Sequence, residues 1–333
     1  MTGTGPLVSV ILPTYNRAAL LPGAINSVLS QTYPNWELVI WDDGSTDNTE
    51  EVVRSHSDRR INYHRDENHG VSYARNRAIE LSRGEYVAFL DSDDEWMAGK
   101  LSAQVEVMNS HPQIDLLFTD FLSVSQTRSK ALRAFEHYSR AMRLLRVEHA
   151  GENLFIIDGG FLEGLAVVDF IATDTAILRQ GVLKRVGCFN EELRSSEDFE
   201  LWWRMGLAGF SFAYLDRPYL TRYKYTCGLS SPSVAGCLSR MAALDICLQG
   251  SRARGRTDLI NHLRPCYRNA WMNMISACSA VGDYRGVLKA FRESTRYGLR
   301  PGALRLLARA IWELTKQPGP HQRSSPLGEN RAR

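Results

Sequence analysis

The sequence lacks the features that mark several large classes of protein. No apolar run reaches the roughly 18 residues that a membrane-spanning helix requires, and residues 1–6 contain neither the basic nor the apolar segment of a secretory signal. The six cysteines form no C-x-x-C pair and show no metal-ligand spacing, so we expect free thiols in a reducing compartment. These absences predict a cytoplasmic protein.

A large excess of charge is also missing. The formal net charge is +3 over 333 residues, so nucleic acid is not an expected partner. The excess lies near the C-terminus, where arginine outnumbers the acidic residues from Leu238 onward. That bias suits peripheral contact with an anionic membrane surface or an acidic partner, and a solvated basic face is the alternative that charge runs favour.

Apolar runs that end in turn residues alternate with amphipathic segments over the first 120 residues. Continuous apolar runs are typical of strands that are covered on both faces. The predicted strands are 7–12, 37–41, 61–64, 86–90 and 115–119, and the predicted helices are 17–30, 46–54, 71–82 and 97–109. This alternation predicts an open α/β sheet, in which ligands bind at the carboxyl ends of the strands.

The remaining chain is less regular. Residues 125–164 are rich in basic residues, and we expect a helical excursion or a lid near the site. Beyond them the pattern predicts a strand at 167–178, helices at 180–186 and 198–207, and strands at 210–215 and 219–225. Residues 232–316 read as helical, with an apolar stripe through Leu304 and Ile311, and the composition of residues 317–333 predicts a disordered tail.

An acidic cluster, Asp91-Ser92-Asp93-Asp94-Glu95, closes the predicted strand at 86–90. Four carboxylates in five residues repel one another, and a bound cation or solvent offsets that cost. Carboxylate oxygens suit Mg²⁺ or Mn²⁺, which commonly bridge to phosphates. The alternative is a helix N-terminus, with Asp94 or Glu95 facing the helix dipole. The position at a strand end favours the metal site.

Two further motifs lie next to predicted strands. Pro13-Thr14-Tyr15-Asn16-Arg17 follows the first strand and offers an aromatic ring for stacking and a guanidinium for phosphate. The second strand ends at Asp42-Asp43, whose carboxylates can accept from the N–H group of a nucleotide base. The alternative for this second motif is capping of the next helix.

Two candidates lie on helices. Arg75 is one turn into the helix at 71–82, where it can reach a diphosphate or be an ordinary surface arginine. Glu197-Asp198 opens the helix that carries Trp202 and Trp203. A carboxylate at a helix N-terminus stays ionised and can accept a proton from an attacking hydroxyl. The tryptophans suit a sugar face, although core packing is their more common role.

Together these segments resemble family 2 glycosyltransferases of the GT-A fold. The matching segments are 8–16, 36–47, 70–77, 84–96 and 187–204, in the order that the family has them. The resemblance implies a GT-A-type open mixed sheet with flanking helices at 1–231, with a nucleotide-binding half at about 6–120 and an acceptor half at about 121–231. The helical region at 232–316 and the tail at 317–333 lie outside the resemblance.

The resemblance also implies roles for single residues. We expect donor binding by Pro13, Thr14, Tyr15, Arg17, Asp43, Arg75, Asp91 and Ser92, metal binding by Asp93 with Asp91 as a less certain neighbour, a general base at Asp198 supported by Glu197, and acceptor contacts by Trp202 and Trp203. In this scheme Tyr15 stacks on the base and Asp43 accepts from it. The divalent metal, Mn²⁺ or Mg²⁺, stabilises the departing diphosphate.

The activity that follows is inverting transfer of a sugar from a nucleotide-diphosphate donor, most simply a UDP-sugar, to a hydroxyl of a glycan or lipid-linked acceptor. Cell-surface polysaccharide or glycoconjugate biosynthesis is the expected setting. The alternative is a non-catalytic module on the same fold that binds nucleotide-sugar or glycan. A nucleotidyltransferase would need a phosphate loop rich in glycine and lysine near the start, and residues 12–17 have none.

One segment departs from the family pattern. Many relatives carry a Tyr-Arg-x-His element after the helix that holds the base, and the position of the histidine is Thr226 in this chain. Lys224 or Arg222 can supply the missing phosphate contact in its place.

Overall fold

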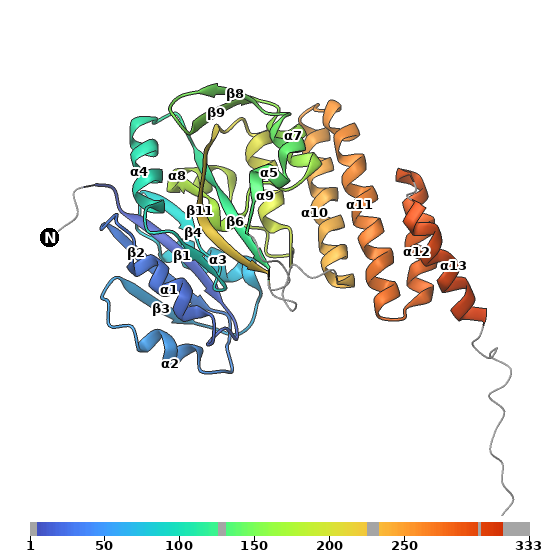
Figure 1. Cartoon of the computed structure of the whole chain (residues 1–333), viewed down its shortest axis with the longest axis horizontal. Coiled ribbons are helices and arrows are strands. Elements are labelled where there is room, and N and C mark those ends of the chain that lie inside the picture. The colour runs from blue at the N-terminus through green and yellow to red at the C-terminus, as the bar shows by residue number, and fades with distance from the viewer. Residues whose placement is uncertain (1–4, 126–130, 225–232, 299–300, 316–333) are drawn as a thin grey trace, which may run out of the picture. The chain divides into compact units, whose positions relative to one another are not determined.

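The computed structural model describes residues 5–125, 131–224, 233–298 and 301–315. The chain forms two compact units, the first made of Met1–Ser231 and Ser239–Cys266 and the second of Pro232–Leu238 and Tyr267–Arg333. The first unit holds the sheet, and the second is helical (Figure 1). The predicted boundary at residue 231 differs from this division, because Ser239–Cys266 packs with the first unit.

The first unit is built on one mixed, open sheet. Its strands are β1 (Val8–Thr14), β2 (Trp36–Asp42), β3 (Ile61–Arg65), β4 (Tyr86–Phe89), β5 (Asp94–Trp96), β6 (Leu116–Ser125), β7 (Leu132–Arg133), β8 (Arg146–His149), β9 (Leu154–Gly159), β10 (Ile177–Arg179) and β11 (Phe212–Lys224). The main strand order is β3-β2-β1-β4-β10-β6-β11-β9-β8. Strands β3, β2, β1 and β4 are parallel, whereas β10 is antiparallel to both of its neighbours. The predicted fold class is confirmed.

Helices flank this sheet in the first unit and make up the second (Figure 1). The helices are α1 (Leu21–Leu29), α2 (Thr49–Arg54), α3 (Val71–Leu81), α4 (Lys100–Ser110), α5 (Ala134–His137), α6 (Ser139–Met142), α7 (Phe161–Val167), α8 (Gln180–Val186), α9 (Glu197–Leu207), α10 (Val234–Ala253), α11 (Asp258–Ala280), α12 (Tyr284–Ser294) and α13 (Pro301–Thr315), with 3-10 turns η1 (Thr173–Thr175) and η2 (Thr295–Tyr297). Helix α1 begins with a proline in its first turn, where the missing N–H has no partner to lose.

The core explains why the first strands read as continuous apolar runs. Every residue of β1 is buried, because the sheet is covered on both faces. Leu12, Ile25 and Ile40 are fully buried in one cluster that joins β1, α1 and β2. Burial of each such side chain contributes roughly 1.5–3 kcal/mol. This rigid half of the sheet holds the strand ends where the acidic motifs lie.

Two predicted strand boundaries were wrong. Of the predicted strand at 167–178 only Ile177 and Leu178 lie in a strand, β10, because Thr173–Thr175 form the turn η1. The Thr175 Oγ1, for example, donates to the carbonyl of Ala172 at 2.6 Å. The predicted strands at 210–215 and 219–225 are the single strand β11, whose register shifts on either side of Pro218. Proline has no N–H for the ladder, so the pairing is interrupted there.

The segment predicted as a helical excursion or lid, residues 125–164, contributes strands to the sheet. Strands β8 and β9 form an antiparallel hairpin, and β9 pairs with β11. Helices α5 and α6 are the helical part of the expectation. Residues 126–130 lie outside the described part of the chain.

In the helical unit, α12 begins with a side-chain cap. Asp283 caps α12, because its side chain accepts from the N–H of Gly286 at 2.9 Å.

None of the helices in the described ranges is long and apolar enough to cross a membrane. The cysteines that the structure describes are free, as predicted, and they are Cys188, Cys237, Cys247, Cys266 and Cys278. The predicted tail at 317–333 lies outside the described residues.

Candidate active site

Two carboxylates that follow β4 meet a third from a distant part of the chain. Asp91 follows β4, Asp94 begins β5 and Asp174 lies in η1. Oxygens of these three carboxylates all lie within 4.8 Å of one another. Asp94 and Asp174 are buried, whereas the Asp91 side chain is 27% exposed. The sequence did not point to Asp174, because a single aspartate in a segment that reads as a strand carries no motif.

Arg222 on β11 neutralises the two buried members of this cluster. Its Nε lies 3.3 Å from Asp94 Oδ2 and its Nη2 lies 3.2 Å from Asp174 Oδ1. The backbone N–H of Tyr223 also donates to Asp94, at 3.1 Å. Burial and the neighbouring Asp174 raise the pKa of the Asp94 carboxyl to about 11, so Asp94 carries the proton that the pair shares. Against the effect of burial, Arg222 lowers the pKa of Asp174.

The carboxylates of Asp91 and Asp93 remain partly accessible to solvent. Asp93, the predicted metal ligand, is not in the group of three, and its Oδ2 lies 3.6 Å from Arg17 Nη2. Burial and the charge of Asp91 raise the pKa of Asp93, a cost that a divalent cation would remove. The oxygen ligands of this region therefore fit Mg²⁺ or Mn²⁺. Ser92, which lies between Asp91 and Asp93, is buried.

Arg75 joins the acidic cluster after β4 to Glu197 at the start of α9. Its Nη2 donates to Asp91 Oδ1 at 2.7 Å and its Nη1 to Glu197 Oε1 at 2.5 Å. The side chain is 4% exposed, so it is not an ordinary surface arginine. Burial opposes its charge, but Asp91 and Glu197 outweigh burial and raise the pKa of Arg75. The predicted contact between Arg75 and the diphosphate of the donor would be made in addition to these two ion pairs.

Asp198, the predicted base, stands at the start of α9. Its Oδ2 accepts from the hydroxyl of Thr173 at 2.8 Å and its Oδ1 from the N–H of Phe199 at 2.8 Å. Ser196 precedes the helix in the left-handed conformation with φ 63°, which is uncommon outside glycine and turns the chain into the site. Burial and then Asp198 raise the pKa of the neighbouring Glu197.

The predicted acceptor contacts of Trp202 and Trp203 were wrong. Both side chains are buried, with 0% and 1% exposed, so neither ring can face a sugar. The indole N–H of Trp203 donates to Ser251 of α10 at 3.1 Å. Both rings belong to the core that α9 covers, whereas Asp198 stands in the first turn of this helix.

The loops after β1 and β2 are bonded to each other. The backbone N–H of Asn16 donates to Ser45 Oγ at 2.8 Å, and Asn16 Oδ1 accepts from the N–H of Thr46. Tyr15 is 47% exposed, as a stacking ring needs to be, whereas Pro13 and Thr14 belong to buried β1. This arrangement leaves one aromatic face open at the carboxyl end of β1.

Asp43 already supports the turn before α3. Its two carboxylate oxygens accept from the N–H groups of His69 and Gly70, each at 2.8 Å. The side chain of Asn68 donates to its backbone carbonyl at 3.0 Å. A base N–H would therefore bind a carboxylate whose orientation is fixed in advance. Its neighbour Asp42 accepts from Ser45 N at 2.8 Å within the turn, and Asp47 accepts from the N–H of Thr49, the first residue of α2, at 3.1 Å.

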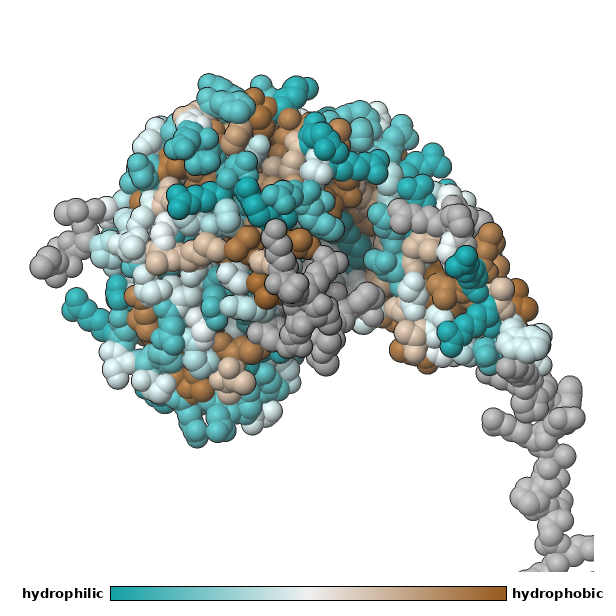
Figure 2. Space-filling model, in the orientation of Figure 1, coloured by the Kyte–Doolittle hydropathy of each residue, from teal (hydrophilic) through white to brown (hydrophobic). Residues whose placement is uncertain are grey.

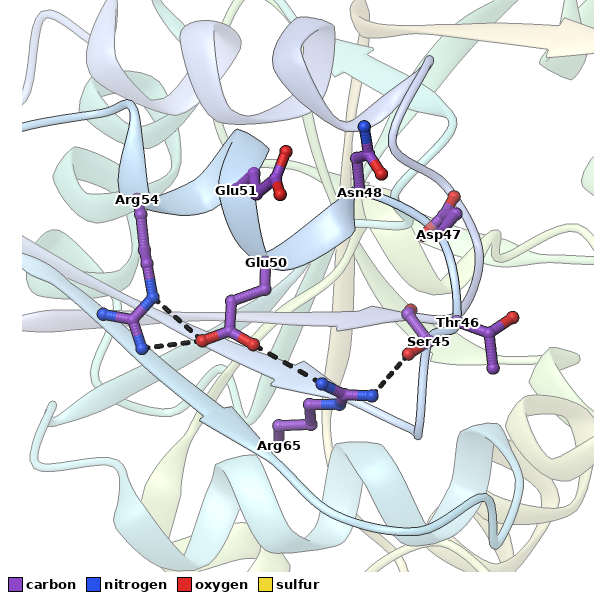
Figure 3. Close-up of a pocket in the computed structure, with 8 residues that line it drawn as sticks. All are labelled: Ser45, Thr46, Asp47, Asn48, Glu50, Glu51, Arg54 and Arg65. Carbon is purple, nitrogen blue, oxygen red and sulfur yellow. Dashed lines mark hydrogen bonds and ion pairs between the residues drawn. The ribbon is translucent and has the colours of Figure 1, made fainter.

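A hollow beside α2 is separate from the acidic cluster. Figure 3 shows its lining side chains, which are Ser45, Thr46, Asp47, Asn48, Glu50, Glu51, Arg54 and Arg65. Its charges pair with one another, because Glu50 binds both Arg54, at 2.7 Å, and Arg65, at 3.4 Å. It contains neither Asp91 nor Asp198, so the chemistry described above lies elsewhere.

The element proposed to replace the family histidine is only partly visible. Thr226 and the side chain of Lys224 lie outside the described residues. Arg222 is committed to Asp94 and Asp174, so it is not free to bind a phosphate without breaking those ion pairs.

Comparisons with known proteins agree with this fold. A mannosyltransferase from Pyrobaculum calidifontis, PcManGT, solved with GDP-Man and Mn²⁺, superposes with a TM-score of 0.55 at 17% identity, over 94% of this chain and 82% of that one. The fold is thus that of the GT-A glycosyltransferases. Residues 9–184 match the model of glycosyl transferase family 2, and the chain belongs to that family.

Two relatives are more similar to this chain in sequence, over a shorter stretch. The putative teichuronic acid biosynthesis glycosyltransferase TuaG of Bacillus subtilis is 47% identical over 111 residues, 32% of this chain and 44% of that protein. The UDP-Glc:alpha-D-GlcNAc-diphosphoundecaprenol beta-1,3-glucosyltransferase WfgD of Escherichia coli is 48% identical over 103 residues, 31% of this chain and 41% of that protein. The aligned part thus spans less than half of either relative.

Proposed function

We propose that the chain is an inverting glycosyltransferase that moves a sugar from a nucleotide-diphosphate donor to an acceptor hydroxyl. The observation that carries the proposal is the Arg75 bridge, which places the acidic cluster beside the start of α9. Asp91, which can hold a metal, and Glu197, the neighbour of the proton acceptor Asp198, therefore lie on either side of one guanidinium. Single displacement at an anomeric carbon needs this pair of functions.

Asp198 is proposed as the base that takes the proton of the acceptor hydroxyl. Asp91 and Asp93 are proposed to hold Mn²⁺ or Mg²⁺, because Asp94 and Asp174 are already neutralised by Arg222. When bound, the metal supplies positive charge to the departing diphosphate. PcManGT, which has the same fold, was solved with Mn²⁺, and this supports the metal assignment.

The proposed donor is a UDP-sugar and the proposed acceptor is a lipid-linked or other glycan of the cell surface. The name of WfgD specifies UDP-Glc and a diphosphoundecaprenol acceptor, and the name of TuaG specifies teichuronic acid biosynthesis. In this chain, exposed Tyr15 would stack on the base and Asp43 would accept from it. Arg17, which is 31% exposed, lies where it can reach a phosphate.

Nucleotide release tests the proposed reaction. The full chain is incubated with UDP-glucose, UDP-N-acetylglucosamine or GDP-mannose, with Mn²⁺ or with a chelator, and with N-acetylglucosaminyl-diphosphoundecaprenol as acceptor. We expect Mn²⁺-dependent release with a UDP-sugar and a product whose anomeric configuration is inverted, seen by NMR. Absence of both release and binding with every donor would contradict the proposal.

The base assignment has its own test. Asp198→Asn should lower transfer by about 10²- to 10⁴-fold while the affinity for UDP and Mn²⁺ stays within twofold. Glu106→Gln makes a similar acid-to-amide change at an exposed position on α4 and should leave transfer unchanged. Full activity of Asp198→Asn would show that another group is the base.

We further propose that the chain works at the inner face of a membrane, held there by α13. Leu304 and Ile311 are 53% and 48% exposed, and Arg305 and Arg309 on the same helix are exposed too. Figure 2 shows apolar residues gathered among polar ones over the C-terminal helices. An apolar stripe flanked by arginines suits the interface of an anionic bilayer.

Vesicle co-sedimentation tests this surface. The full chain should sediment with vesicles of phosphatidylcholine and phosphatidylglycerol, and much less with phosphatidylcholine alone. The double substitution Leu304→Glu and Ile311→Glu should abolish sedimentation. Leu81→Glu with Leu132→Glu, two exposed leucines of the first unit, is the matched control and should not. Equal sedimentation of both double variants would refute membrane docking by α13.

A further inference from the structure

One hydrogen bond to Asp198 comes from a segment that the proposed reaction does not use. The hydroxyl of Thr173 donates to Asp198 Oδ2 at 2.8 Å, while the other carboxylate oxygen accepts from Phe199 N. We propose that Thr173 is a positioning residue, which turns the Asp198 carboxylate toward the acceptor hydroxyl. The inference rests on the proposed role of Asp198 as the base.

The hydroxyl of Thr173 is hard to replace. Thr173 is 2% exposed, so a water molecule has little space to take over its hydrogen bond if the hydroxyl is removed. A carboxylate held only through the N–H of the next residue can still rotate about its side-chain bonds. The second hydrogen bond from Thr173 removes that freedom, and such preorganisation lowers the cost of reaching the reactive geometry.

The turn η1 that carries Thr173 is itself fixed by three contacts from other elements. The indole N–H of Trp96 donates to the carbonyl of Asp174 at 2.9 Å, and Gln104 Nε2 donates to that of Thr175 at 2.9 Å. The third contact is the ion pair between Arg222 and Asp174. A hydroxyl on so rigid a turn can define an orientation, which a hydroxyl on a loose loop cannot.

The same turn reaches the acidic cluster through the next residue. Asp174 lies with Asp91 and Asp94, all within 4.8 Å by their carboxylate oxygens. Adjacent residues of η1 therefore contact the proposed base and the proposed metal region. This connection sets the separation between the group that accepts the proton and the group that holds the leaving diphosphate.

The step that Thr173 serves is a single displacement. The acceptor oxygen forms a bond to the anomeric carbon as the bond from that carbon to the diphosphate oxygen breaks. The proton of the acceptor hydroxyl passes to the Asp198 carboxylate, and the bonding pair leaves with the nucleotide diphosphate. Thr173 keeps its own proton throughout and acts only through Asp198.

Three substitutions in one turn test the inference. Thr173→Val removes the hydroxyl at constant shape, and Thr173→Ser keeps the hydroxyl without the methyl group. Thr175→Val is the matched control, because Thr175 is equally buried in η1 and its hydroxyl donates to the carbonyl of Ala172 instead of a carboxylate. Each full-length variant is assayed for nucleotide release with Mn²⁺, the donor that the wild type uses, and water as the acceptor, and for UDP binding by calorimetry.

We expect Thr173→Val to lower kcat by about 10- to 100-fold with the donor KM and the Kd for UDP unchanged. Thr173→Ser should restore kcat to within about threefold of the wild type, and Thr175→Val should match the wild type. A Thr173→Val variant with undiminished kcat, or a Thr173→Ser variant as slow as Thr173→Val, would overturn the inference. If Thr173→Val does not fold, Thr173→Ala against Thr173→Ser gives the same comparison.

Failure of the inference and failure of the proposed function are distinguishable. If Asp198→Asn abolishes release while Thr173→Val leaves kcat intact, Asp198 remains the base and only the role of Thr173 is lost. If Asp198→Asn leaves release intact, the base assignment falls and the inference falls with it.

Discussion

Two arginines each bind two carboxylates of the site. Arg75 binds Asp91 and Glu197, and Arg222 binds Asp94 and Asp174. Each guanidinium connects carboxylates that are far apart in sequence, so each holds two elements together as well as balancing their charge. Removing one arginine would leave a buried carboxylate without a partner.

Arg75→Met should therefore be strongly destabilising. It leaves buried Glu197 unpaired, and we expect the free energy of unfolding to fall by about 3–5 kcal/mol, measured by urea denaturation. Arg77→Met on the same helix is the control, since Arg77 binds Glu80 with side chains 33% and 54% exposed and should cost less than about 1 kcal/mol. Similar losses for the two variants would show that the Arg75 bridge contributes little.

Lys100 gives the stability of the protein a dependence on pH. The side chain is fully buried, donates to Gln104 Oε1 at 2.6 Å, and lies over the ring of Trp96. Burial lowers the pKa of Lys100 to about 7, against the raising effect of Asp174. Between pH 7 and about 10.4, the usual pKa of lysine, the unfolded chain binds this proton and the folded chain does not.

Stability linked to Lys100 should therefore rise with pH across that window and be lost as pH falls through about 7. Urea denaturation of the wild type and of Lys100→Met at pH 7 and pH 9.5 measures the effect. The difference in unfolding free energy between the two proteins should shift in favour of the wild type at the higher pH. A difference that is independent of pH would contradict the lowered pKa.

At the scale of elements, strands with long apolar runs were predictable and short ones were not. Strands β1, β2 and β4 are buried on both faces, so their residues show the run that the sequence displays. Strand β10 has only Ile177–Arg179, and its place between β4 and β6 depends on partners that precede it by tens of residues. No local pattern specifies such pairing, and the turn η1 before it was missed for the same reason.

The turn that precedes α3 depends on Asp43. Asp43→Asn keeps the size of the side chain but leaves one acceptor oxygen for the N–H groups of His69 and Gly70. We expect the unfolding free energy to fall by about 1–3 kcal/mol and the Kd for UDP to rise at least tenfold. Calorimetric titration with UDP and Mn²⁺ measures the second effect, and Asp216→Asn, outside this turn, is the control. Unchanged UDP affinity would separate Asp43 from donor binding.

At the scale of the whole molecule, the division of the chain could not be read from the sequence. The candidate residues Asp91, Asp93 and Asp198 stand in motifs at element ends, and their roles stay predictions. Residues Ser239–Cys266 carry no motif of this kind, yet they belong to the sheet-containing unit. Their attachment is specific, since Ser239 Oγ donates to Ser195 O at 2.8 Å and accepts from Ser195 N.

Shortened chains test the division of the protein into two units. A chain that ends at residue 231 loses Ser251, the partner of the buried Trp203 indole, and exposes the core face that Ser239–Cys266 covers. We expect it to aggregate, whereas a chain that ends at residue 282 should remain monodisperse by size-exclusion chromatography and bind UDP. A well-folded 231-residue chain with normal UDP affinity would show that the helices are dispensable.

The Arg75 bridge also bears on how the protein is made. Its two residues are separated by 122 positions, so at about 5–20 residues per second the ribosome delivers Glu197 about 6–24 s after Arg75. For most of that interval Arg75 has only Asp91 as its partner, and the edge of β4 waits for β10. An open strand edge is a starting point for aggregation. The residues that join the two halves of the site thus also set the period in which the newborn chain needs protection.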